Sequence, residues 1–92
     1  MEGEIFTYLQ DPSHGWIAVT KQQLKELGIA DKISQCSYVS PSDDIVWLEE
    51  DCDASLFVQT YKEKYGYDPA IQEVVISNRA FLRNFSRYTP EG

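Results

Sequence analysis

An apolar run leads directly into a cluster of acids in this chain, and a helical pattern begins straight after it. The run Ile45–Leu48 is typical of a buried strand, and four acids follow within five residues: Glu49, Glu50, Asp51 and Asp53. Acids suit a helix start because they accept hydrogen bonds from free N–H groups and meet the positive end of the helix dipole. The same cluster suits a hard cation or a basic partner, so three interpretations stay open.

The helix that follows this cluster is predicted over Ala54–Tyr65, where apolar residues recur at helical spacing. Asp53 or Asp51 is expected to cap its start, and Gly66 is expected to end it. The pattern indicates one apolar face directed at a core.

An earlier and shorter helix is predicted over Lys21–Leu27 from the signals at its two ends. Thr20 and Gln23 form a capping box at its start, and Gly28 supplies a left-handed stop. A helix of about two turns is marginal alone, so packing must hold it.

Five segments have the composition of strands: Ile5–Leu9, Trp16–Val19, Cys36–Ser40, Ile45–Glu49 and Ile71–Ser77. The turn formers of residues 41–44 indicate a hairpin between the third and the fourth. We predict a single α+β domain with a largely antiparallel sheet of four or five strands and two helices. The β-α-β-β-α-β order fits a ferredoxin-like arrangement over residues 1–77, among other strand orders.

Residues 78–92 form a basic and aromatic C-terminal tail of the same domain. The chain's three arginines, Arg79, Arg83 and Arg87, all lie here, whereas residues 1–75 hold fourteen of the fifteen acids. As a helix, the tail would place its aromatic residues on one face and its arginines on the other. We expect the tail to fold back onto the acidic body; a separate binding role for the arginines is the alternative.

The charge of the chain limits its partners. A net charge of −7 and a pI near 4.5 argue against nucleic acid and against anionic membranes, since both attract cationic proteins. The sequence shows no signal peptide and no apolar run of membrane-spanning length, so a cytoplasmic setting is expected. Cys36 and Cys52 form no Cys-x-x-Cys pair, which gives no support to a zinc site or a redox dithiol; both are expected to be reduced, with Cys36 buried.

Catalytic chemistry has little support in the sequence. His14, the single histidine, lies in a turn where it is expected to stack on Trp16. A cysteine–histidine pair would need both groups within hydrogen-bond reach, and the spacing does not require this. No glycine-rich phosphate loop occurs. We therefore favour a non-enzymatic role and predict no catalytic residue, no metal and no cofactor.

Four segments resemble those of small proteins encoded by bacteriophages, plasmids and bacterial genomes: His14–Val19, Leu27–Ser34, Trp47–Ala54 and Arg83–Tyr88. The resemblance covers most of the chain and carries no established activity. It implies a bacterial or phage-infected cytosol and a mobile-element gene. Since small acidic proteins of mobile elements often block host machinery, it also implies an interaction protein.

The expected function is therefore that of a protein-binding module, able to inhibit a host protein, with a basic protein as partner. Its predicted contact surface comprises Glu49, Glu50, Asp51 and Asp53, the hairpin-loop acids Asp43 and Asp44, and Trp47. One alternative is a small-ligand or metal-binding module, or an enzyme, built on the His14–Trp16 turn and the acid cluster. Another is a self-associating structural subunit.

Overall fold

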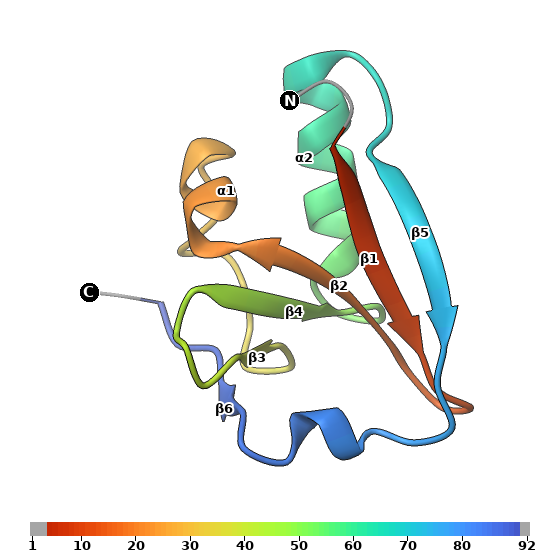
Figure 1. The fold of residues 1–92 in the computed structure, drawn as a ribbon. Coiled ribbons are helices and arrows are strands. Elements are labelled where there is room, and N and C mark those ends of the chain that lie inside the picture. Colours follow the sequence, from red (N-terminus) through yellow and green to blue (C-terminus); the bar gives the residue numbers. More distant parts are fainter. Residues whose placement is uncertain (1–3, 91–92) are drawn as a thin grey trace.

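A computed structural model describes residues 4–90 of the protein, and these fold around a single sheet with two helices (Figure 1). In chain order the elements are β1 Ile5–Gln10, β2 Gly15–Thr20, α1 Lys21–Glu26, β3 Tyr38–Val39, β4 Ile45–Glu49, α2 Ala54–Tyr65, β5 Ala70–Val75, the 3-10 turn η1 Ala80–Leu82 and β6 Ser86–Arg87. The predicted α+β class is confirmed. No helix within the described residues is both long and apolar enough to cross a membrane.

The sheet has six strands in the order β5-β1-β2-β4-β3-β6. Every neighbouring pair is antiparallel except β1 and β5, which run parallel. The predicted four or five strands were too few, because a short segment of the tail pairs with β3 and adds a strand at that edge.

The ferredoxin-like arrangement is matched only roughly. Strand β4 lies between β2 and β3, so β2-α1-β3 is a split β-α-β unit of the ferredoxin-like kind. However, the N-terminal strand β1 lies between β5 and β2, and β6 extends the opposite edge. Local patterns predict strands well, but the neighbour of each strand depends on packing far along the chain.

Both helices cover one face of the sheet and close the main core. This core contains Leu24 of α1 and Phe57 of α2 together with the strand residues Ile17, Val19, Val46 and Leu48. The ring of Phe6 on β1 meets Phe57 edge-on, with centroids 5.1 Å apart. Alternation along the strands directs these side chains to the helices and leaves Trp16 and Trp47 on the second face.

The local helix signals are largely confirmed. Thr20 and Gln23 form both hydrogen bonds of the capping box, and Gly28 takes a φ of 73° after α1. Helix α2 has the predicted bounds and ends at Gly66, whose φ is 84°. The expected acid cap is wrong: Asp53 occupies the N-cap position, but its side chain makes no capping hydrogen bond.

The tail docks on the body, although not as one helix. Figure 1 shows the C-terminal segment leaving β5, passing through η1 and reaching β6 beside β3. Phe81 packs on Trp47 on the second face of the sheet, with centroids 5.1 Å apart, whereas Tyr88 joins the core on the helix side. The single aromatic face that one continuous helix would produce is not formed, because the short strand β6 follows η1 in the tail.

Candidate functional site

Burial divides the acid cluster that follows β4. Glu49 and Asp53 are buried, at 7% and 4% exposure, whereas Glu50 and Asp51 are exposed. The turn after β4 buries its first and last acids and leaves Glu50 and Asp51 between them exposed. The four acids therefore do not present one continuous surface to a partner.

Asp53 holds the loop before β3 against the start of α2. Its carboxylate accepts hydrogen bonds from the backbone N–H of Ser34 at 3.1 Å, from the Ser34 hydroxyl at 2.9 Å and from the Ser37 hydroxyl. The Ser37 hydroxyl in turn accepts from the backbone N–H of Glu49 at 3.1 Å. We call these contacts the Asp53 clamp. A buried carboxylate with several donors is stable in this position.

Glu49 is satisfied only in part. Its Oε1 accepts from the backbone N–H of Asp51 at 2.7 Å, whereas its Oε2 is buried with no hydrogen-bond partner among the described residues. The indole Nε1 of Trp16, opposite Glu49 in the strand register, is likewise buried without a partner among them. A donor, Trp16 Nε1, and an acceptor, Glu49 Oε2, are thus both without a partner among the described residues, although their residues are paired across β2 and β4.

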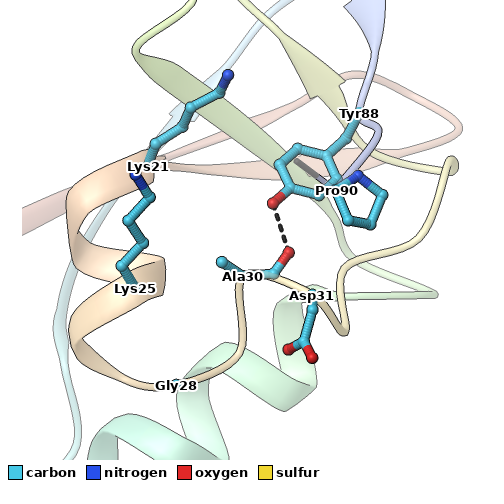
Figure 2. Close-up of a pocket in the computed structure, with 7 residues that line it drawn as sticks. All are labelled: Lys21, Lys25, Gly28, Ala30, Asp31, Tyr88 and Pro90. Carbon is cyan, nitrogen blue, oxygen red and sulfur yellow. Dashed lines mark hydrogen bonds between the residues drawn. The ribbon is translucent and has the colours of Figure 1, made fainter. Parts of the chain in front are cut away.

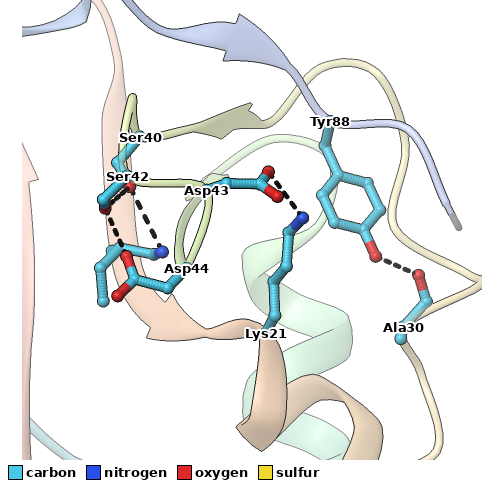
Figure 3. A network of polar contacts seen from close by, with 8 residues as sticks. Lys21, Ala30, Ser40, Ser42, Asp43, Asp44 and Tyr88 are labelled. Atoms are coloured by element: carbon cyan, nitrogen blue, oxygen red, sulfur yellow. Dashed lines mark hydrogen bonds and ion pairs between the residues drawn. The ribbon is translucent and has the colours of Figure 1, made fainter.

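The loop acids Asp43 and Asp44 lie at the far end of β4 from Glu49. Lys21 contacts Asp43 at 2.8 Å, and Asp44 accepts from the Ser42 hydroxyl (Figure 3). A five-residue strand separates the two ends by about 16 Å. The structure therefore does not bring the loop acids together with the acids after β4.

Trp47 is half-buried rather than presented to a partner. Besides Phe81, it meets Phe85 of the tail with ring centroids 6.5 Å apart. Its indole is therefore used largely for docking the tail.

The tail arginines differ in their contacts. Arg79 lies 3.7 Å from Asp11, hydrogen-bonds Nδ1 of His14 and covers the Trp16 ring at 5.4 Å. Arg87 covers the Tyr38 ring and donates to the carbonyl of Gln35 at 3.1 Å. Arg83 is exposed. The expected return of the tail to the body thus holds for two of the three arginines.

Asp11 anchors the turn that carries His14. Backbone N–H donation from His14, supported by Ser13 and by the charge of Arg79, holds the Asp11 pKa below its ordinary 3.8. The predicted stacking is confirmed: His14 and Trp16 have ring centroids 5.9 Å apart and an interplanar angle of 26°.

A cleft of about 340 Å³ joins these groups, and we call it the Trp16 cleft. It is lined by His14, Trp16, Cys36, Tyr38, Glu49, Asp51, Cys52, Arg79 and Arg87. Three of the four segments that carry the resemblance contribute to it. The sequence did not indicate that Cys36 and Cys52 meet, because they lie sixteen positions apart in different elements.

A second groove of about 390 Å³ lies between α1, the loop after it and the end of the tail (Figure 2). Lys21, Lys25 and Asp31 line it together with Tyr88, whose hydroxyl donates to the carbonyl of Ala30. Lys21 is already engaged by Asp43. The groove thus lies where the end of the tail packs against α1 and the loop that follows it.

The exposed apolar side chains gather elsewhere, at the β5 edge of the sheet. Within the described residues, the large hydrophobic side chains that are exposed all lie on β1, on β5 or in the turn before β5: Ile5 at 64%, Tyr67 at 41%, Ile71 at 44%, Val74 at 39% and Val75 at 78%. This exposure could not be predicted from the residue pattern, because a β-rich apolar run has the same pattern in a central strand and at an edge.

The backbone of β5 is also open along its outer side. The N–H of Ile76 donates to the carbonyl of Gln10 on β1 at 2.8 Å. Residues alternate in direction along a parallel ladder, so the backbone groups of Ile71, Glu73 and Val75 point away from β1. Since β5 is the terminal strand, these groups face the outside of the sheet.

An acidic spot lies beside this edge. Glu73 pairs with Tyr8 in the β1–β5 register, and the Tyr8 hydroxyl donates to Glu50 at 2.7 Å. Burial, the hydrogen bond to Glu50 and the surrounding acids raise the pKa of Tyr8 above its ordinary value. Glu50 and Glu73 thus make the local potential negative.

Comparisons of the chain with family models, curated proteins and solved structures found no match. No group of three or more His, Cys, Asp or Glu side chains within residues 4–90 is placed to hold a metal ion. Within residues 4–90 the protein is a small α+β domain whose terminal strand β5 exposes apolar side chains and whose surface carries the Trp16 cleft.

Proposed function

We propose that the protein is a binding module that adds an extended segment of a basic protein to its sheet along β5. The observation that carries this proposal is the gathering of exposed apolar side chains at one open edge. An open edge offers main-chain hydrogen bonds, and its side chains select what pairs with it.

The acids beside the edge favour a basic partner. A segment paired with β5 would pass close to Glu73, with Glu50 nearby across Tyr8. Its apolar residues would cover Ile71 and Val75, and a lysine or arginine would meet Glu73. We therefore keep a basic protein as the proposed partner, and we propose the β5 edge rather than the whole acid cluster as its binding surface.

A second copy of the chain fits this edge less well. An antiparallel pair of β5 strands that sets Ile71 opposite Val75 also sets Glu73 opposite its own copy. Like charges directly opposed on neighbouring strands destabilise the pair. Each copy also carries a net charge of −7, which adds long-range repulsion.

The experiment is selection of binders from a displayed random peptide library, followed by affinity measurement on three variants. Glu73→Pro removes an outward N–H without removing a ladder bond to β1. Loss of that bond should weaken selected peptides by about 10-fold or more. Glu73→Gln keeps the edge and removes the charge, so a loss of roughly 2- to 5-fold is expected, and salt should reduce it.

Glu63→Gln on the exposed side of α2 is the matched charge control and should leave affinity unchanged. Selected peptides should alternate apolar residues and carry Lys or Arg. Peptides that bind Glu73→Pro as tightly as the unchanged protein would refute the edge proposal. A concentration-dependent dimer that Glu73→Pro dissociates would instead identify the occupant as a second copy.

A second candidate function is small-ligand binding in the Trp16 cleft. The observation that favours it is the pair of buried unpartnered atoms, Trp16 Nε1 and Glu49 Oε2. A polar ligand that accepts from the indole and donates to the carboxylate would satisfy both. At about 100 times its Kd, such a ligand would stabilise the fold by roughly 2.7 kcal/mol. A thermal-shift screen of small polar metabolites tests this, and Glu49→Gln should abolish the shift.

A further inference from the structure

Two cysteines line the Trp16 cleft. Cys52, in the turn before α2, is exposed, and Cys36, in the loop before β3, is half-buried. Both side chains line the cleft, and the Cys36 thiol is near enough to raise the pKa of Cys52. Residues sixteen positions apart are thus brought together by the fold rather than by a short motif.

The backbone on both sides of this contact is fixed by the Asp53 clamp. Ser37, next to Cys36, donates to Asp53, which is next to Cys52. The N–H of Cys36 also donates to the Ser34 hydroxyl at 3.1 Å, and the N–H of Cys52 donates to the Glu49 carbonyl at 3.2 Å. The two cysteines are therefore held in place before any covalent bond forms.

We propose that Cys36 and Cys52 are a dithiol modification site that a disulfide-containing oxidant such as oxidised glutathione converts into an intramolecular disulfide. In the first step the exposed Cys52 thiol loses its proton to solvent and attacks one sulfur of the oxidant. A Cys52–glutathione bond forms and one glutathione thiolate leaves. The Cys36 thiol then loses its proton to solvent and its sulfur attacks Sγ of Cys52, so that the protein disulfide forms, the Cys52–glutathione bond breaks and the second glutathione thiolate leaves. Two protein thiols are oxidised and one glutathione disulfide is reduced.

The surroundings of Cys52 make the first step slow at neutral pH. The hydrogen bond with Cys36, burial and the charges of Glu49 and Asp53 raise the Cys52 pKa to about 11. Asp51 lines the same cleft, and so do Arg79, Arg87 and His14 from the tail and the β1–β2 turn. Formation of the disulfide should therefore accelerate about 10-fold for each pH unit between pH 7 and 10.

The experiment equilibrates the full chain with defined ratios of reduced and oxidised glutathione, quenches with acid and alkylates the remaining thiols. Intact mass spectrometry then gives the fraction of the chain that holds the intramolecular disulfide. This species is a monomer that is two hydrogens lighter and carries no alkyl group. The same titration is run in concentrated guanidinium chloride. Because the clamp positions the two cysteines in advance, the equilibrium constant for forming the disulfide should be about 10-fold or more larger for the native chain than for the denatured chain.

Two variants complete the test. Cys36→Ser should stop at the Cys52–glutathione adduct, and Ser37→Ala should lower the native preference while keeping both cysteines. Native protein that yields only glutathione adducts or disulfide-linked dimers would overturn the proposal. A native preference no greater than that of the denatured chain would also overturn it. None of these outcomes depends on what binds at β5.

Discussion

Removing the Asp53 carboxylate is the sharpest test of how this fold is held together. In Asp53→Ala the backbone N–H of Ser34 and the hydroxyls of Ser34 and Ser37 lose their acceptor. Ser37 is fully buried, at 0% exposure, so water does not replace the lost bond. Hydrogen bonds to a charged acceptor contribute about 1.5–3 kcal/mol each, and they are not additive. We expect a loss of about 3–5 kcal/mol in the free energy of unfolding.

The measurement is urea unfolding followed by tryptophan fluorescence. For a domain with a typical stability of about 5–15 kcal/mol, this loss should shift the urea midpoint by 1 M or more. Asp51→Ala is the matched control, since Asp51 is an exposed acid two positions away. It should change stability by less than about 0.5 kcal/mol. Equal effects of the two variants, or a loss below about 1 kcal/mol for Asp53→Ala, would refute the clamp.

Three further predictions concern other contacts of the fold. The folded-state pKa of Asp11 lies below 3.8, so the ionised Asp11 stabilises the fold above pH 3.8, and this contribution is lost as the pH falls through the folded pKa. The difference in Tm between Asp11→Asn and the unchanged protein should therefore vanish towards pH 2. A Cβ at Gly15 would lie 2.1 Å from the Tyr8 hydroxyl, so Gly15→Ala should lower the free energy of unfolding by about 1–3 kcal/mol. In a Tyr8→Ala background the same substitution should lower it much less, which a double-mutant cycle measures. Phe81→Ala removes the edge-on contacts of Phe81 with Trp16 and Trp47. Trypsin should therefore cleave the tail of this variant after its arginines faster than it cleaves the unchanged protein. An unchanged cleavage rate would argue against docking of the tail through Phe81.

The helices could be predicted because their signals are local. The capping box at Thr20 and the left-handed glycines at 28 and 66 lie within a few residues of the ends that they define. The sheet order could not be predicted in the same way. The insertion of β1 between β5 and β2 depends on contacts between residues far apart along the chain.

The candidate sites show the same limit. Two of the four acids after β4, Glu49 and Asp53, are buried, so clustering in sequence did not translate into one surface. Cys36 and Cys52 line one cleft because the fold brings their segments together, with Ser37 beside Cys36 bonded to Asp53 beside Cys52. The apolar residues of β5 resemble those of a core strand, and their position at the sheet edge leaves several of them exposed.

Amide hydrogen exchange on the complex with a selected peptide tests the proposed function most directly. Edge pairing predicts that the outward amides of Ile71, Glu73 and Val75 slow by about 10-fold or more on binding, whereas those of Gln72 and Val74, already in the ladder with β1, change little. Unchanged exchange at the three outward amides, with protection appearing instead around the loop acids Asp43 and Asp44, would contradict the account.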